Sequence, residues 1–131
     1  MTEGKIPTEL KYTKSHEWIR LEGDVATVGI TDHAQSELTD IVYVDLGAKG
    51  KSVAAAATVL VLESVKTVAD VYAPFAGTVD DVNADLKSHP ELINQDPYGK
   101  GWIFRLKLSG PADVGTFLSP DDYRAFVASG G

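Results

Sequence analysis

The chain of 131 residues contains no cysteine. This absence excludes a disulfide framework, a thiolate metal site and a cysteine nucleophile, so any redox-active sulfur has to come from a cofactor. No apolar run approaches the length of a membrane-spanning helix. The N-terminal stretch "MTEGKIPTEL" has neither the hydrophobic region of a signal peptide nor an arginine-rich transit pattern. We therefore expect a soluble cytoplasmic protein, or a mitochondrial one only if a transit peptide has been removed.

Positive charge is also scarce. Twelve Lys and Arg stand against nineteen Asp and Glu, which gives a net charge of −7. Binding to nucleic acid depends on clustered Lys and Arg that neutralise phosphates, so the composition argues against a nucleic-acid partner. The length suits one core, and no shift in composition marks a boundary. We expect a single domain over residues 1–131, with a loose N-terminal segment at 1–9 and a loose tail at 129–131.

Alternation of apolar and polar residues with a period of two dominates the chain. In "HEWIRLEGDVATVGI" the alternation continues on both sides of Glu22-Gly23-Asp24, which predicts a hairpin. Further short strands are predicted for "IVYVDLG", "TVLVLES", "TVADVYA", "GTVDDVN" and "WIFRLKL". Many short strands at close spacing are typical of a β-sandwich or flattened barrel, so the predicted fold is mainly β.

Signals for helices are few. The stretch "TDHAQSEL" offers Thr31 or Asp32 as an N-cap, whereas "NADLKSHPELINQDPYGKG" predicts a loop with at most a turn or two of helix. A C-terminal helix is better marked, with Ser119 as N-cap and Pro120 in the first helical position. Its apolar stripe consists of Tyr123, Phe126 and Val127. We expect this helix to pack on the sheet.

The stretch "LVLESVKTVADVYAP", residues 60–74, places a lysine at the tip of a tight hairpin. Val65 and Lys66 form the central pair; because neither is Gly or Asn, a type I turn is favoured over the primed turns. A lysine at such a tip is most often only a solubilising charge. Two glycines favour a special role for this lysine. Gly50 lies sixteen residues before Lys66 and Gly77 eleven after it, where a chain that builds a symmetric hairpin would have to turn or to admit a close neighbour.

The framed lysine resembles that of lipoyl and biotinyl carrier domains, and from about residue 10 onward the chain closely resembles the glycine cleavage system H proteins. The stretches that carry the resemblance are "SHEW" (15–18), "GITDHAQ" (29–35), "ESVK" (63–66), "DVYAP" (70–74), "VN" (82–83) and "LINQDPYGKGW" (92–102). The residues beside the lysine distinguish this family from other carriers. Biotinyl domains typically have Met-Lys-Met and the acyltransferases of 2-oxoacid dehydrogenase complexes have Asp-Lys-Ala, whereas Lys66 here lies between Val65 and Thr67. The resemblance implies a lipoyl/biotinyl-type hammerhead β-sandwich with a few short helices.

Three residues depart from the pattern of this family. Thr39 and Gly47 stand where the family usually has Gly and Pro, and Ala56 replaces a usual Gly. These departures concern local turn geometry more than function.

The resemblance implies that Lys66 carries lipoate in amide linkage. The chain would then be a carrier and not an enzyme, which shuttles an aminomethyl group from glycine decarboxylase (P-protein) to aminomethyltransferase (T-protein) and then meets dihydrolipoyl dehydrogenase (L-protein). A lipoate-attaching enzyme would be a further partner. The same resemblance implies a cleft in which the amine of the loaded arm meets Ser15, Glu17 and Asp70, with His33 nearby.

Other interpretations stay open. A carrier that only relays lipoate to other proteins would use the same lysine. A small hydrolase that uses His33 with Glu17 or Asp70 is disfavoured, because no Ser, Cys or metal constellation accompanies them. Glu17 and Asp70 are also compatible with solvated carboxylates, Ser15 with a turn residue and His33 with a helix-surface imidazole. The histidines at 16, 33 and 89 have no partner at ligand spacing, so we expect no metal site.

Overall fold

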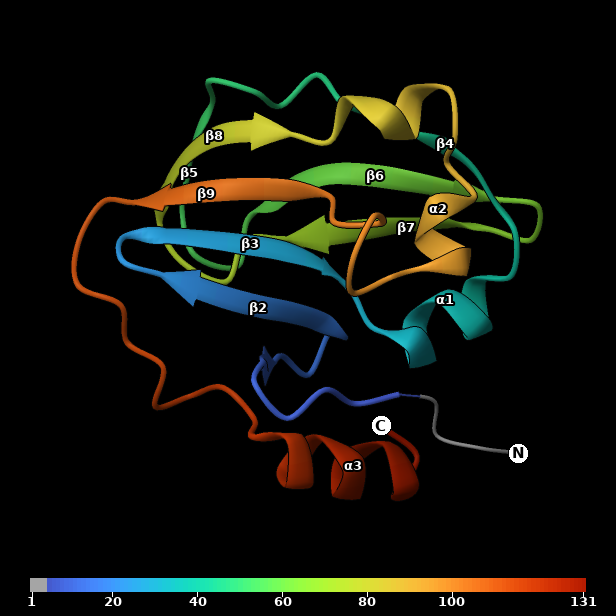
Figure 1. Cartoon of the computed structure of the whole chain (residues 1–131). Helices are drawn as coiled ribbons and strands as arrows, with labels where there is room; N and C mark the ends of the chain where they lie inside the picture. Colours follow the sequence, from blue (N-terminus) through green and yellow to red (C-terminus); the bar gives the residue numbers. More distant parts are fainter. Residues whose placement is uncertain (1–4) are drawn as a thin grey trace.

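The period-two segments form two antiparallel sheets in the computed structural model, which describes residues 5–131 (Figure 1). The six-stranded sheet has the order β1 (Lys11–Tyr12), β2 (Glu17–Glu22), β3 (Val25–Ile30), β9 (Phe104–Leu108), β8 (Gly77–Val82) and β5 (Ser52–Val53). The three-stranded sheet has the order β4 (Ile41–Val44), β6 (Thr58–Ser64) and β7 (Val68–Tyr72). The mainly-β sandwich predicted from the sequence is confirmed.

The main core lies between the two sheets. Val28 and Leu106 from the six-stranded sheet belong to the same buried cluster as Leu60, Leu62 and Val71 from the three-stranded sheet. Burial of these apolar side chains is the main stabilising contribution to such a fold. The outer faces of the sheets are thereby left to other elements or to solvent.

The helices are short, as predicted. They are α1 (Asp32–Leu38), the 3₁₀ helix η1 (Ala84–Lys87), α2 (Leu92–Gln95) and α3 (Pro120–Ala128). Thr31 is the N-cap of α1, and its hydroxyl accepts the backbone N–H of Ala34 at 3.2 Å. None of the helices within residues 5–131 combines the length and hydropathy that crossing a membrane requires.

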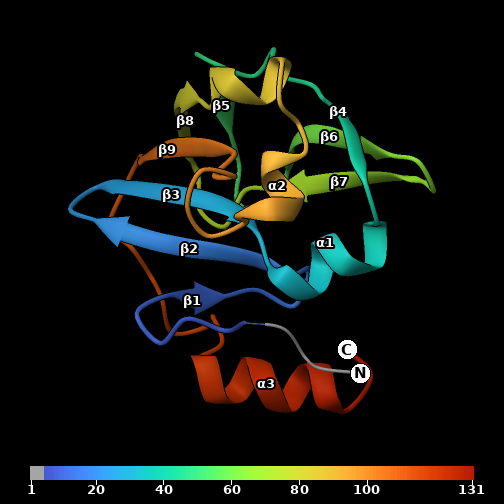
Figure 2. The ribbon, with the colours of Figure 1, turned by 45° about the vertical axis from the view of Figure 1, so that its right-hand side comes forward.

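Helix α3 lies along the β1 side of the six-stranded sheet (Figure 2). Ser119 caps it by accepting the N–H of Asp122 at 3.1 Å, as predicted. Its buried Tyr123 joins a second apolar cluster with Leu10, Tyr12 and Trp18. The helix therefore covers one edge of the sheet and not the core between the sheets.

Both ends of the described chain make specific contacts, inside the segments that the sequence predicts to be loose. Ile6 is only 8% exposed and belongs to the cluster beneath α3, and the hydroxyl of Tyr12 donates to the carbonyl of Pro7 at 2.6 Å. At the other end, the N–H groups of Gly130 and Gly131 donate to the carbonyls of Val127 and Phe126. This pattern is a Schellman motif, which satisfies carbonyls at the end of α3. Residues 1–4 of the expected loose segment lie outside the described residues.

The two framing glycines have different reasons to be glycine. Gly50 has a φ of 89°, a conformation that L side chains rarely adopt. Gly77 lies against strand β9, where an added Cβ would overlap the carbonyl oxygen of Lys107. The turn expected at one framing glycine is therefore present at Gly50, and the close approach expected at the other is present at Gly77.

Two of the residues that depart from the family pattern adopt positive φ angles. Thr39 has φ 65° and ψ −152°, and Ala56 has φ 69°. The geometry suited to glycine is retained at both positions although the residue is not glycine. Such conformations cost about 1–3 kcal/mol for a residue with a Cβ.

Candidate functional site

The exposed lysine lies in the predicted two-residue turn between β6 and β7. Ser64 and Thr67 close the turn through the Ser64 N–H, which donates to the carbonyl of Thr67 at 2.8 Å. The hydroxyl of Ser64 accepts the N–H groups of Lys66 at 3.2 Å and Thr67 at 3.0 Å. Neither Val65 nor Lys66 has a positive φ, so the primed turns are excluded as predicted. The serine hydroxyl makes the turn rigid while the lysine side chain stays in solvent.

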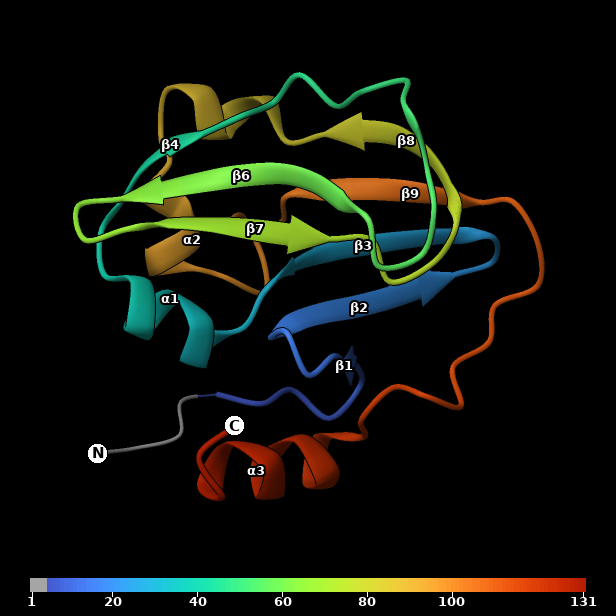
Figure 3. The same cartoon turned by 180° about the vertical axis from the view of Figure 1, so that it is seen from behind.

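The connection from α1 to β4 supports this turn from one side. The N–H of Val65 donates to the carbonyl of Asp40 at 3.0 Å. The Nζ of Lys66 lies 3.5 Å from the carbonyl oxygen of Glu37, near the C-terminal end of α1. The lysine side chain therefore reaches toward the C-terminal end of α1. Figure 3 shows that α1 and β7 lie on either side of a gap below the lysine turn.

That gap contains a cavity of about 210 Å³, which we call the arm cleft. Its polar lining residues are Ser15, His16, His33, Glu37 and Asp70. Its apolar lining residues include Leu38, Leu62, Ala69 and Val71. The cleft thus offers a narrow apolar floor beside the lysine turn, and it brings together three of the predicted residues, namely Ser15, His33 and Asp70.

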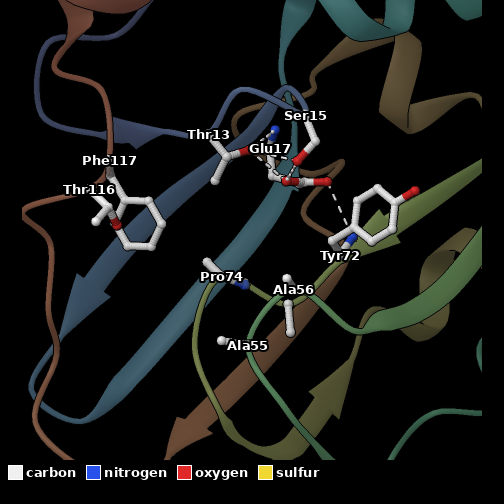
Figure 4. A pocket seen from close by; sticks show the side chains of 10 residues that line it. Thr13, Ser15, Glu17, Ala55, Ala56, Tyr72, Pro74, Thr116 and Phe117 are labelled. Atoms are coloured by element: carbon white, nitrogen blue, oxygen red, sulfur yellow. Dashed lines mark hydrogen bonds between the residues drawn. The ribbon is translucent and has the colours of Figure 1, made fainter.

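Glu17, the fourth predicted residue, borders a second cavity of about 480 Å³ (Figure 4). Tyr72 and Phe117 also line this cavity, which we call the Glu17 pocket. Ser15 borders both cavities, so they adjoin at its side chain. The predicted set of four residues is therefore divided between two adjacent cavities.

Glu17 is a buried carboxylate, unlike most acidic side chains, which are solvated. Its side chain is 1% exposed, and its Oε1 accepts the hydroxyls of Thr13 and Ser15, each at 2.6 Å. Its Oε2 accepts the backbone N–H of Tyr72 at 3.2 Å (Figure 4). Burial raises the pKa of Glu17, and the hydrogen bonds from Ser15, Thr13 and Tyr72 oppose that rise. Sequence reasoning singled out Glu17 but did not place Thr13 or Tyr72 at the site.

Asp70 is the opposite case, because its side chain is exposed on β7 at the rim of the arm cleft. His33 on α1 lies across this cleft, and its Nε2 is 4.0 Å from the carboxylate of Glu37 one turn later. A cation that enters the cleft would meet Asp70 in solvent and the buried Glu17 beyond Ser15.

His16 contributes to the arm cleft as well as to packing. It has a φ of 69°, and its Nδ1 is 2.8 Å from the hydroxyl of Tyr123. The same hydroxyl lies 2.7 Å from the Oγ1 of Thr31, the N-cap of α1. The rings of His16 and His33 are 4.8 Å apart, and burial followed by the charge of His33 lowers the pKa of His16. Tyr123 on α3 therefore links His16 in the cleft to the N-cap of α1.

The site has no sign of a metal centre within residues 5–131, where no group of three or more His, Asp or Glu side chains is arranged to hold an ion.

The proximity of His16 and His33 could not be read from their spacing in the sequence. The only feature of the sequence that bears on this proximity is the apolar stripe of the C-terminal helix, because that stripe contains Tyr123, the residue that bonds to His16.

Comparison with known proteins gives a consistent result over nearly the whole chain. The family model described as Glycine cleavage H-protein matches residues 10–130. The chain is 50% identical over 119 residues to the glycine cleavage system H protein of Acinetobacter baumannii (strain SDF), covering 91% of this chain and 96% of that protein. The protein of the same name from Laribacter hongkongensis is 56% identical over 123 residues, with 93% and 97% covered. A crystal structure of a glycine cleavage system H protein from Mycobacterium marinum aligns with a TM-score of 0.84 at 34% identity, covering 94% of this chain and 99% of that chain.

Proposed function

Because the chain belongs to the glycine cleavage H-protein family, we propose that it carries lipoate in amide linkage on Lys66 and presents it to the enzymes of glycine cleavage. The observation that carries this proposal is the turn itself. A primary amine projects into solvent from a hairpin that Ser64 and the carbonyl of Asp40 hold in place. A flexible arm on a rigid mount is what a group that visits several active sites requires.

The residues around Lys66 fit such a group. The arm cleft begins where the Lys66 side chain already points, and its apolar floor of Leu38, Ala69 and Val71 suits an alkyl chain. Amidation removes the charge of Lys66, so the modified side chain can lie on that floor without burying an ammonium ion. When bound, lipoate would supply the thiol–disulfide chemistry by which an aminomethyl cargo is carried, on a chain that has no cysteine of its own, and Leu38, Ala69 and Val71 would line its alkyl part.

The chain itself would hold the aminomethyl cargo of the arm and protect it from water. Asp70 offers an exposed carboxylate at the rim of the cleft, and Ser15 leads from there to the buried carboxylate of Glu17. A cationic amine at this point would gain the attraction of both carboxylates. His33 lines the same cleft opposite β7. We assign Ser15, Glu17, His33 and Asp70 to cargo binding and no catalytic role to the chain.

A tethered cargo need not be recaptured from solvent between enzymes, which is the advantage of a carrier. P-protein, T-protein, L-protein and a lipoate-attaching enzyme are the partners that this role requires. The bacterial relatives compared above support the cytoplasm as the compartment in which they meet.

Lys66→Arg tests the attachment site. Guanidinium keeps the positive charge but is a poor acyl acceptor, so the variant should fold normally and take no lipoate. Incubation with a lipoate ligase followed by intact-mass measurement should show the lipoyl increment on the wild type and on the control Lys87→Arg, another exposed lysine. A lipoyl increment on Lys66→Arg would remove Lys66 from the proposal.

Glycine–bicarbonate exchange with P-protein tests the role in glycine cleavage. The lipoylated wild type should support exchange, and Lys66→Arg should not. A lipoylated wild type that fails to support exchange with an active P-protein would instead favour a carrier that only relays lipoate.

A further inference from the structure

The outer face of the three-stranded sheet carries a cross-strand row next to the lysine turn. Tyr43 on β4 pairs with Glu63 on β6, and Glu63 pairs with Val68 on β7. Directly opposed residues of antiparallel strands point to the same face, and successive residues along a strand alternate. Because Leu62 is buried in the core, the row that contains Glu63 points away from it.

A second row runs parallel to the first. Val61 pairs with Asp70 on β7, and the N–H of Asp45 donates to the carbonyl of Val61 at 3.1 Å. A register shift between Ile41 and Tyr43 also turns Val42 outward, so that two successive residues of β4 are exposed. We call the surface formed by Val42, Tyr43, Asp45, Glu63, Val65 and Val68 the tip face.

The apolar members of the tip face are unusually exposed for their type. Tyr43 and Val42 are each 53% exposed, Val68 is 60% exposed and Val65 at the turn is 67% exposed. Figure 3 looks onto β6 and β7, and no helix of the described chain crosses them on this side. Contiguous exposed apolar residues with a polar border are typical of an interaction site.

The charges around the tip face are almost all negative. No Lys or Arg lies between Arg20 and Lys49 in the sequence, and Lys66 is the only one between Lys51 and Lys87. These stretches contain α1 and the whole three-stranded sheet, whose exposed carboxylates belong to Glu37, Asp40, Asp45, Glu63 and Asp70. Among the ion pairs of residues 5–131, none joins Asp45, Glu63 or Asp70 to a cation. Acylation of Lys66 would therefore leave these two stretches of the sequence without a Lys or Arg charge.

We propose that the tip face is the docking surface for glycine decarboxylase, which seats on it with an apolar rim that bears Lys and Arg side chains around its opening for the arm. This inference rests on the proposed function, because the root of the arm then lies at the border of the tip face. The oxidised arm carries no charge, so long-range attraction to the decarboxylase has to come from the protein surface. Asp45 and Glu63 provide that attraction, and Tyr43 and Val68 provide the apolar contact.

Binding of the unlipoylated chain to P-protein tests the proposal without any contribution from the arm. Isothermal titration calorimetry should give a wild-type Kd that rises with salt concentration, because exposed charges are screened. The triple variant Tyr43→Ser, Asp45→Asn, Glu63→Gln should raise the Kd by about tenfold, or about 1.4 kcal/mol. The single charge reversal Glu63→Lys keeps every apolar side chain and should weaken binding in the same direction.

The six-stranded sheet offers a matched control. The variant Leu21→Ser, Glu22→Gln, Asp80→Asn changes one exposed apolar residue and two exposed acids on other strands, and its Kd should stay within about twofold of wild type. Undetectable binding of the unlipoylated wild type, a Kd insensitive to salt, or equal Kd values for wild type and a folded triple variant would each overturn the tip face as docking surface. These outcomes are distinct from failure of the carrier role, which would appear as lack of exchange by the lipoylated wild type.

Discussion

The carboxylate of Glu17 on β2 accepts the backbone N–H of Tyr72 on β7 at 3.2 Å, and so joins the two sheets at the cavity that both residues line. Thr13 and Ser15 bond to the other carboxylate oxygen. A buried acid held in this way has a structural role, and we propose that its charge also serves a cationic cargo. The two roles can be separated by experiment.

The first prediction concerns pH and stability. Burial raises the pKa of Glu17 in the folded protein above its ordinary 4.5. At a pH between 4.5 and the higher pKa of the folded protein, Glu17 keeps a proton in the folded state that it has lost in the unfolded state. The contribution of this ionisation is therefore fully present below pH 4.5 and is lost as pH rises through the folded pKa. Glu17→Gln is neutral at every pH and should lack this dependence.

Urea unfolding of wild type and Glu17→Gln between about pH 4 and about pH 7 measures the effect. The stability of the wild type relative to the variant should fall as pH rises across this range. Glu22→Gln, an exposed acid at the end of the same strand, serves as the control. A constant difference between wild type and Glu17→Gln would show that Glu17 ionises alike in both states.

The second prediction concerns the cargo. The double variant Glu17→Gln, Asp70→Asn keeps the shape of both side chains and removes both charges. Retention of an aminomethyl cargo should fall by about tenfold, which corresponds to about 1.4 kcal/mol, because a partly desolvated amine loses its counter-charges. Lipoylation and reoxidation by L-protein should be nearly unchanged, since neither involves a charged cargo.

Release of formaldehyde and ammonia from loaded protein, followed without T-protein, is the measurement. The variant Glu22→Gln, Asp80→Asn removes the same number of charges elsewhere and should release at the wild-type rate. Equal rates for all three proteins would make Glu17 and Asp70 irrelevant to protection.

The third prediction concerns the hydroxyl of Tyr123, which lies within hydrogen-bonding distance of His16 and Thr31. Tyr123→Phe keeps the ring stacked on Tyr12 but leaves the buried hydroxyl of Thr31 and the partly buried Nδ1 of His16 without this partner. The free energy of unfolding should fall by about 1–2 kcal/mol. Tyr43→Phe, at a half-exposed tyrosine, should change it by less than about 0.5 kcal/mol. Denaturant titration of both variants makes the comparison, and a loss equal in the two would contradict the bridging role.

The fourth prediction concerns Thr39, whose φ of 65° and ψ of −152° are essentially restricted to glycine. Thr39→Gly should raise the free energy of unfolding by about 1 kcal/mol, because relief of strain exceeds the extra entropy of glycine in the unfolded chain. Thr78→Gly, on β8 with an ordinary φ, should lower it instead. Thermal unfolding compares the two, and a loss of stability in Thr39→Gly would argue against strain at this position.

The fifth prediction concerns Gly77, whose missing side chain lets β8 approach the backbone of Lys107. Gly77→Val should cost about 1–3 kcal/mol, because the strand has to move away from its neighbour. We also expect slower lipoylation, on the proposal that the lipoate-attaching enzyme recognises the shape of the lysine hairpin. Gly110→Ala is the control, because an added Cβ there meets nothing within 4 Å. Unchanged stability and an unchanged lipoylation rate in Gly77→Val would mean that this glycine is incidental.

The sequence by itself determined the local elements of this protein. The period-two alternation placed the strands, Thr31 or Asp32 and Ser119 marked two helix starts, and the missing Gly or Asn at Val65 and Lys66 disfavoured a primed turn. These features depend on interactions between residues close in sequence, so propensity and capping chemistry are enough to predict them.

Only the tertiary structure decided which distant residues meet. Glu17 was identified by resemblance, but its burial and its bond to the N–H of Tyr72 on β7 are tertiary features. His16 bonds to Tyr123, which α3 brings beside it. The row of Tyr43, Glu63 and Val68 likewise depends on strand register. The burial of Ile6 has the same origin, since the cluster that buries it contains residues distant in the sequence such as Tyr123. Burial and register are properties of the packed chain, and a one-residue slip of a strand would turn each of these side chains to the other face.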